Sequence, residues 1–537
     1  MRRALYALSL TLFAALLPGC RKADPRGDGA SAEPAQAASS RSAPGPSAAA
    51  HRPGAPWFQG STEQAVSAAK AEKKLLFLAW SAVWCPPCNE LKADVFEKPR
   101  FSELMRDFIP VYLDGDTEEA QGWGDKLNAT SYPTVLVLTP EGDELIRFSG
   151  GFGIGELERA IEAINKGPGR SFGKAVERLS AGAPAAEDIR ILAQSDWGDL
   201  PEAEWSPLRR FTTLQSALER CPADLRPERA MLAANLLTFV ATGQGDETLA
   251  KPLADLAAKA GGYLDSIFAD AETAWAARTF IHFRAGDMAS FLFEGRRGDA
   301  YEAFKKRWLD AAAAIRARGD ASVGVRLWSM IPMLDFFRFE DPSGPIPAAM
   351  KAEIEAAAAL ADEQARSPFE RHAVISGAVY LLRRVSAHEK ARAMLLAEAA
   401  RSDTPYYYYS GLSALEQELG RKEEARSWSE KARKNATGRA TRMQWIANDI
   451  LLNAKLEGPE QKGYLRAAAE EFYELATAQA DGFMGRNRSR VEQVRGALAP
   501  LQGDPAMKEL FARYRARCSS LPADGQKACL AHFDGLR

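Results

Sequence analysis

The pentapeptide Trp84-Cys85-Pro86-Pro87-Cys88 separates two segments of different character. The apolar run 75–80 (LLFLAW) precedes it, and the segment 89–96 (NELKADVF) follows it. A continuous apolar run of this length is typical of a central strand that is buried on both faces of its sheet. The following segment has the apolar spacing of a helix. The sequence therefore predicts a strand that leads into a pair of cysteines at the start of a helix.

This placement favours a chemical use for Cys85 and Cys88. The nucleophile of thiol–disulfide exchange is the thiolate, so a working cysteine needs a lowered pKa. Cys85 is expected at the helix N-cap, with Pro86 and Pro87 in the first helical positions, where a missing N–H has no cost. Free N–H groups and the positive end of the helix dipole would face its sulfur. We expect Cys85 to be the more exposed thiol with the lower pKa, and Cys88 to be the shielded thiol that resolves the mixed disulfide.

Two other uses of the cysteine pair are a zinc half-site and a closed structural disulfide. Zinc takes four ligands, but the sequence contains no second C-x-x-C motif, and its five histidines are far apart along the chain. The redox interpretation is favoured because strand, cysteine pair and helix follow one another in the required order. It needs no cofactor, since the Cys85–Cys88 pair itself carries the electrons.

The segments around the motif predict a small α/β domain. Strands are expected at 75–80, 108–113, 135–138 and 145–148, and helices near 61–74, 89–96, 118–127 and 157–164. This order, together with the motif at 84–88 and Pro133 just ahead of a strand, resembles the thioredoxin superfamily over residues 57–167. The resemblance implies a thioredoxin fold, in which a central mixed sheet is flanked by helices.

The resemblance also implies roles for single residues. Pro133 corresponds to the cis-proline that faces the cysteines, keeps the loop from closing on them and presents a backbone edge to the substrate; an X-Pro bond is the only inexpensive site for a cis peptide. Trp84, Pro86 and Pro87 complete the active-site motif. Ala79 departs from the family, which has a buried acidic residue there that helps to move the proton of the second cysteine. This departure questions efficient reductase activity but not thiol chemistry itself.

The N-terminus predicts export from the cytoplasm. Arg2 and Arg3 precede an apolar run that is too short to span a membrane and suits a signal peptide. The ending Leu17-Pro18-Gly19-Cys20 resembles the lipobox of bacterial lipoproteins, which implies removal of residues 1–19 and lipidation of Cys20. An ordinary secretory signal with a chance cysteine is the alternative. In both cases the compartment permits disulfides.

The resemblance to lipoproteins places the chain in the bacterial cell envelope, facing the periplasm and held to the membrane only by its lipid. Arg21 stands where an aspartate would favour retention in the inner membrane, so the outer membrane is favoured. Residues 20–56 are mostly Ala, Pro, Ser and Gly, and such a segment cannot bury a core. We expect it to be a tether. The net charge of −2 gives no indication of nucleic-acid binding.

Residues 171–537 are expected to form a large all-helical domain. Ala391 and Ala425 occupy matching positions of two similar segments 34 residues apart, which is the tetratricopeptide period. This favours an α-solenoid with tetratricopeptide-like units, and an irregular helical bundle is the alternative. The run 406–409 consists of four tyrosines, which would line a peptide-binding face or simply pack against a neighbouring helix.

The three remaining cysteines have structural interpretations. Cys518 and Cys529 flank a short, turn-rich segment, and in an oxidising compartment we expect them to form a disulfide. Cys221 is left over and is expected to be a buried, inert thiol.

The sequence thus predicts an extracytoplasmic thiol–disulfide oxidoreductase that exchanges disulfides with envelope proteins, with its helical domain selecting the partner. The similarity to extracytoplasmic thioredoxin-like proteins implies a Dsb-type membrane protein as electron donor or acceptor. Reduction, oxidation and isomerisation all stay open, because the sequence does not set the redox potential. The alternative is a binding or holdase module, in which a thioredoxin–tetratricopeptide fusion uses its redox activity only secondarily.

Overall fold

The computed structural model of the chain describes residues 56–536, apart from residues 130, 167–168, 202–203, 244 and 457–459. The predicted signal peptide, the lipidation site at Cys20 and almost all of the predicted tether lie outside the described residues. Within the described part of the chain, no helix combines the length and the apolar character needed to cross a bilayer.

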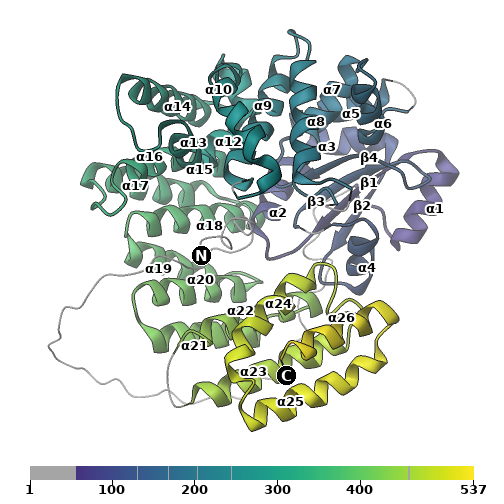
Figure 1. Cartoon of the computed structure of the whole chain (residues 1–537), viewed down its shortest axis with the longest axis vertical. Coiled ribbons are helices and arrows are strands. Elements are labelled where there is room, and N and C mark those ends of the chain that lie inside the picture. Colours follow the sequence, from purple (N-terminus) through teal and green to yellow (C-terminus); the bar gives the residue numbers. More distant parts are fainter. Residues whose placement is uncertain are drawn as a thin grey trace.

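The N-terminal part contains a four-stranded mixed sheet with helices around it (Figure 1). Its strands, in spatial order, are β2 (Phe108–Asp114), β1 (Leu75–Ser81), β3 (Thr134–Leu138) and β4 (Glu144–Ser149). Its helices are α1 (Thr62–Glu72), α2 (Pro86–Leu91), α3 (Pro99–Leu104), α4 (Glu118–Lys126) and α5 (Ile154–Asn165). Strands β1 and β2 are parallel, and the other two pairs are antiparallel. The predicted α/β architecture is confirmed.

The apolar run of β1 accounts for its central place. All of its residues from 76 to 81 are buried, because side chains on both faces of the strand are covered. One face packs on an aromatic cluster that includes Trp57, Phe96 and Phe101. The strand ends just before Trp84, so the cysteine motif lies at the carboxyl edge of the sheet.

All regular secondary structure described after residue 169 is helical, as predicted. The α-helices are α6 (Phe172–Ser180), α7 (Ala186–Gln194), α8 (Pro207–Glu219), α9 (Arg226–Thr242), α10 (Ala250–Ile267), α11 (Ala271–Ala276), α12 (Arg278–Phe283), α13 (Ala285–Phe293), α14 (Asp299–Ala317), α15 (Val323–Trp328), α16 (Ile331–Glu340), α17 (Ala348–Gln364), α18 (Pro368–Arg384), α19 (His388–Ala399), α20 (Pro405–Glu418), α21 (Lys422–Asn435), α22 (Arg439–Asn453), α23 (Gln461–Thr477), α24 (Asn487–Leu498), α25 (Pro505–Arg517) and α26 (Ala523–Asp534). The two similar segments around Ala391 and Ala425 lie on helices α19 and α21, where both alanines are fully buried.

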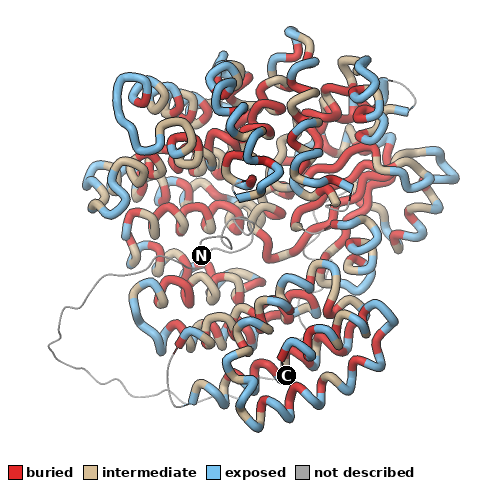
Figure 2. Tube along the Cα trace, viewed as in Figure 1, coloured by how far each residue is buried: buried red, intermediate tan, exposed pale blue. Residues whose placement is uncertain are grey.

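The helical region runs around the sheet in a curved array (Figure 1). Its first helices share one apolar core with the sheet, since Val135 and Ile164 belong to the same cluster as Leu192 and Leu232. The array then descends through α18 to α22, and α18 packs against α2. Buried segments follow both the strands and the inner sides of these helices (Figure 2). The carboxyl edge of the sheet therefore faces protein rather than solvent.

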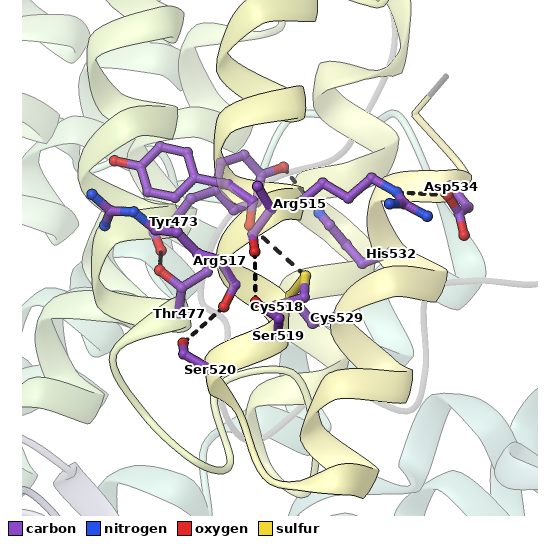
Figure 3. The surroundings of a disulfide bond; sticks show 12 residues. Tyr473, Thr477, Arg515, Arg517, Cys518, Ser519, Ser520, Cys529, His532 and Asp534 are labelled. Atoms are coloured by element: carbon purple, nitrogen blue, oxygen red, sulfur yellow. Dashed lines mark hydrogen bonds and ion pairs between the residues drawn. A yellow bond between two sulfur atoms is a disulfide. The ribbon is translucent and has the colours of Figure 1, made fainter.

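The predicted disulfide between Cys518 and Cys529 is present and joins the end of α25 to α26 (Figure 3). Both cysteines are fully buried. In the same core, the hydroxyl of Tyr473 lies 2.9 Å from Nε2 of His532. A cross-link that closes so short a loop contributes about 2–3 kcal/mol of stability in the chain-entropy account. Cys221 is buried and free, as expected, and burial raises its pKa to about 11.

Candidate redox site

The turn that holds the two cysteines has the predicted backbone geometry. Cys85 is the N-cap of α2 in extended conformation, and Pro86 and Pro87 open the helix. The backbone N–H of Cys88 donates to the Cys85 sulfur at 3.3 Å. The side-chain amide of Asn89 donates to the carbonyls of Val83 and Cys85, both at 2.9 Å. These bonds hold the Cys85 sulfur at the positive end of the helix.

The loop before β3 lies opposite this turn. The Tyr132–Pro133 peptide bond is cis, and the Tyr132 carbonyl oxygen lies 3.7 Å from the Cys85 sulfur. The Tyr132 ring packs between those of Trp80 and Trp84, at centroid distances of 4.1 and 6.2 Å. The structure thus brings Trp84, the cysteine pair and Pro133 together, although they are nearly fifty residues apart in the chain.

The exposure of the cysteines follows the predicted order but is low for both. Cys85, at 4%, is the more exposed thiol, and Cys88, at 1%, is the more shielded one. Both thiols are nevertheless buried. The reason lies outside the thioredoxin-like part: helices α18, α20 and α22, which we call the cap, pack over the turn.

Hydrogen bonds tie the cap to Trp84. The Trp84 indole N–H donates to the hydroxyl of Thr441 in α22 at 2.6 Å. Nε2 of His372 in α18 lies 2.7 Å from the Trp84 carbonyl oxygen. Because a carbonyl only accepts, His372 donates from Nε2. Its Nδ1 atom lies 3.0 Å from the Tyr408 hydroxyl of α20. All three cap helices therefore contribute to one buried network around Trp84.

A second set of contacts fixes the edge of the cap. The Thr441 N–H donates to Oδ1 of Asp116, in the loop after β2, at 3.0 Å. Gly438 has a φ of 77°, and a Cβ there would lie 2.4 Å from Cγ of Asp116, so only glycine allows this approach. Beside the cap, Arg486 stacks on the Tyr132 ring at 4.2 Å and donates to its hydroxyl at 3.3 Å.

Aromatic packing completes the cover. The ring of Trp445 in α22 meets that of Trp84 edge to face at 5.9 Å. Tyr406 and Tyr408 are buried, and Tyr406 belongs to the same apolar cluster as both cysteines. The tyrosine run therefore packs against its neighbours in this structure and does not line an open peptide-binding face.

Burial also changes the electrostatics of the pair. It raises the pKa of the Cys85 thiol well above its ordinary value, and the hydrogen bond between the two thiols raises it further. Burial opposes ionisation of Cys88 too, but hydrogen bonds from the Cys85 thiol and the Ala82 backbone outweigh it and lower the Cys88 pKa. The helix terminus therefore does not lower the pKa of Cys85 in the covered site as predicted, because burial of the thiol outweighs it.

Sequence analysis did not identify His372, Thr441 or Arg486 as parts of the site. Each is a single polar residue of the helical region, and Thr441 lies 357 positions after Trp84. The only signals in the sequence were the tyrosine run and Trp445, which mark apolar helix faces without saying what they cover. Among the described residues, no group of three potential metal ligands is found.

Comparison with known proteins agrees with this geometry. Residues 57–140 match a family model described as thioredoxin-like. No curated protein matches the chain closely enough to count as a relative. The chain thus contains a thioredoxin-like domain at residues 57–140, with a Cys85–Cys88 pair, followed by a large helical region.

Proposed function

We propose that this protein is an extracytoplasmic thiol–disulfide oxidoreductase that acts through Cys85 and Cys88. The observation that carries the proposal is the position of the Cys85 sulfur. It accepts the Cys88 N–H at the start of α2 and faces the Tyr132–Pro133 loop at 3.7 Å. A sulfur at a helix N-terminus beside a second thiol suits disulfide exchange.

The exchange proceeds in two balanced steps. The Cys85 thiolate attacks one sulfur of a substrate disulfide, so a mixed disulfide forms and the other substrate sulfur leaves as a thiolate. The Cys88 thiolate then attacks the Cys85 sulfur, which forms the Cys85–Cys88 disulfide and releases the second substrate thiolate. Two electrons pass from the cysteine pair to the substrate, and the reverse sequence oxidises a substrate dithiol.

The reaction requires the cap to move away from the cysteine pair. A disulfide on a folded protein cannot reach a sulfur that is 4% exposed, so the substrate or redox partner has to displace α22 and its neighbours from Trp84. The same displacement removes the burial that raises the pKa of Cys85. Access and activation of the nucleophile then occur together, which would protect the thiols until a partner is bound.

The compartment and partners belong to the same proposal. The sequence of residues 1–20 supports export and lipid attachment at Cys20, with envelope proteins as substrates and a Dsb-type membrane protein as electron partner. We expect wild-type protein to take up labelled fatty acid and Cys20→Ser to appear in the soluble envelope fraction. A Cys20→Ser protein that stays membrane-bound, together with unlabelled wild type, would contradict the anchor.

The function is tested by equilibrating the purified chain with glutathione and mapping its disulfides. We expect a reversible Cys85–Cys88 disulfide whose population follows the ratio of reduced to oxidised glutathione. Cys518–Cys529 serves as an internal comparison, and a Cys85→Ser/Cys88→Ser variant serves as the blank. If Cys85 and Cys88 form no disulfide even in protein that is partly unfolded by denaturant, the proposed redox function is wrong. Suppression of aggregation that survives in the double variant would then support the binding-module alternative.

A further inference from the structure

Lys92 is a buried amine that the exchange steps above do not use. It lies one helical turn after Cys88, and its side chain is 0% exposed. Its Nζ atom makes no hydrogen bond in the described part of the chain. Lysine is almost never fully buried unless it is paired, and the backbone changes here from α2 to a π-helical segment, Lys92–Phe96. Single π-helical turns are frequent at functional sites.

The surroundings of Lys92 are mainly aromatic and apolar. Its Nζ lies 5.4 Å from the ring centre of Tyr112 in β2 and 5.0 Å from that of Phe369 in α18. Ala79 is the register partner of Tyr112 on β1 and presents only a methyl group to this face of the sheet. Ring contacts of this kind stabilise a cation only weakly. They do not offset the much larger cost of burying an ionised amine.

The groups that act electrostatically on Lys92 identify its counter-charge. Burial lowers the pKa of Lys92, and the side chain that opposes this most strongly is Cys88. Asp114 at the end of β2, Cys85 and Glu97 follow in that order. The strongest potential anion near the buried amine is therefore the thiolate of the resolving cysteine.

We propose that Lys92 is a positioning residue of the redox pair that balances the negative charge of the Cys88 thiolate. This inference rests on the proposed function and adds to it the positive charge that opposes the resolving thiolate. The Cys88 proton leaves to solvent, and the Lys92 ammonium, one helical turn away, offsets the negative charge of the thiolate that remains. The thiolate attacks Cys85 in the mixed disulfide, the Cys85–Cys88 bond forms, and the substrate sulfur leaves with the electron pair. Solvent protonates that sulfur as it leaves, and the Lys92 ammonium then has no thiolate beside it.

The test replaces Lys92 by methionine, which has similar length and no charge. Thiol ionisation is followed by the ultraviolet absorbance of the thiolate during a pH titration, in a Cys85→Ser/Cys221→Ser background in which Cys88 is the free thiol of the described residues. Loss of an adjacent cation raises a thiol pKa by about 1–3 units. We therefore expect Lys92→Met to raise the Cys88 pKa by at least about one unit and to slow resolution of a mixed disulfide about tenfold.

Lys70→Met, at an exposed lysine of α1, is the matched control and should change neither quantity. Lys92→Arg keeps the charge and should preserve the titration better than Lys92→Met. Because Lys92 is buried without a hydrogen-bond partner, we also expect Lys92→Met to unfold at the same denaturant concentration as wild type, or a higher one. A folded Lys92→Met protein with unchanged Cys88 titration and unchanged resolution would overturn the proposal.

A second measurement uses the unaltered chain and does not depend on whether the variant folds. NMR of carbon-labelled lysine follows the Lys92 amine in the reduced and oxidised forms. We expect the Lys92 pKa to fall when the Cys85–Cys88 disulfide forms, because the disulfide carries no charge to stabilise the ammonium. An unchanged value contradicts the inference. If the wild-type pair forms no disulfide, the proposed function fails instead, while the titration of the reduced variants still decides the role of Lys92.

Discussion

Replacing Thr441 by glutamate is expected to increase the rate at which iodoacetamide modifies Cys85 by at least about tenfold. The glutamate side chain is two carbons longer than the space in which the Thr441 hydroxyl accepts the Trp84 N–H, and its carboxylate would lie beside Asp116, whose Oδ1 accepts the Thr441 N–H. An unpaired buried charge next to a second carboxyl is strongly destabilising. A tenfold change corresponds to a loss of about 1.4 kcal/mol from the closed state.

The measurement is timed alkylation followed by mass mapping of the modified cysteines. Buried Cys221, in the helical region, reports whether the whole protein has loosened. Thr212→Glu, at an exposed threonine of α8, is the matched control and should leave the Cys85 rate unchanged. Gly438→Ala should open the same edge without adding charge, because its Cβ would collide with Asp116. Equal Cys85 rates in wild type and both opening variants would show that the cap does not limit access.

The closed state should also depend on pH through Asp116. Burial, and then the nearby Asp114 carboxylate, raise the pKa of Asp116 from 3.8 to about 7. A carboxyl group with a raised pKa stabilises the closed state at low pH, and this stabilisation is lost as the pH rises towards 7. Asp116→Asn keeps an acceptor for Thr441 but cannot ionise. The ratio of wild-type to Asp116→Asn alkylation rates should therefore rise between about pH 4 and pH 7 and stay level above it.

Cys88→Ser is expected to accumulate covalent complexes with envelope proteins that dithiothreitol dissolves, whereas Cys85→Ser accumulates almost none. Without Cys88 the mixed disulfide on Cys85 has no internal thiol to resolve it. Affinity purification followed by non-reducing electrophoresis shows the complexes directly. Because the cap covers Cys85, we expect the yield to increase several-fold when Cys88→Ser is combined with Thr441→Glu.

The pattern of trapping separates the possible roles of the two thiols. Complexes that form with Cys85→Ser instead would make Cys88 the attacking thiol and reverse the proposed roles. Complexes with neither variant, in a protein whose pair does exchange with glutathione, would indicate that the substrate is a small disulfide. The Cys85→Ser/Cys88→Ser variant controls for complexes formed through Cys221.

Local sequence patterns were sufficient to predict the elements of the thioredoxin-like domain and the geometry of its turn. The apolar run before Trp84 predicted the central strand, and Cys85 followed by two prolines predicted the N-cap. The Cys518–Cys529 disulfide was also predicted, from the short segment between the two cysteines and the expected export of the chain. These features depend on residues that are neighbours in the chain, so local hydrophobic spacing and backbone preference are sufficient to reveal them.

Whether the site is open depends on packing between distant segments of the chain. The pKa of Cys85 depends on the same packing. Trp84 bonds to Thr441 across 357 positions, through the packing of many successive helices that no local pattern encodes. In the sequence Lys92 likewise looks like an ordinary, solvent-facing helix residue. It is the sheet, the π-helical segment and α18 that bury it. Burial is a property of the whole assembly of elements, and here the desolvation that it causes outweighs the local effect of the helix terminus on Cys85.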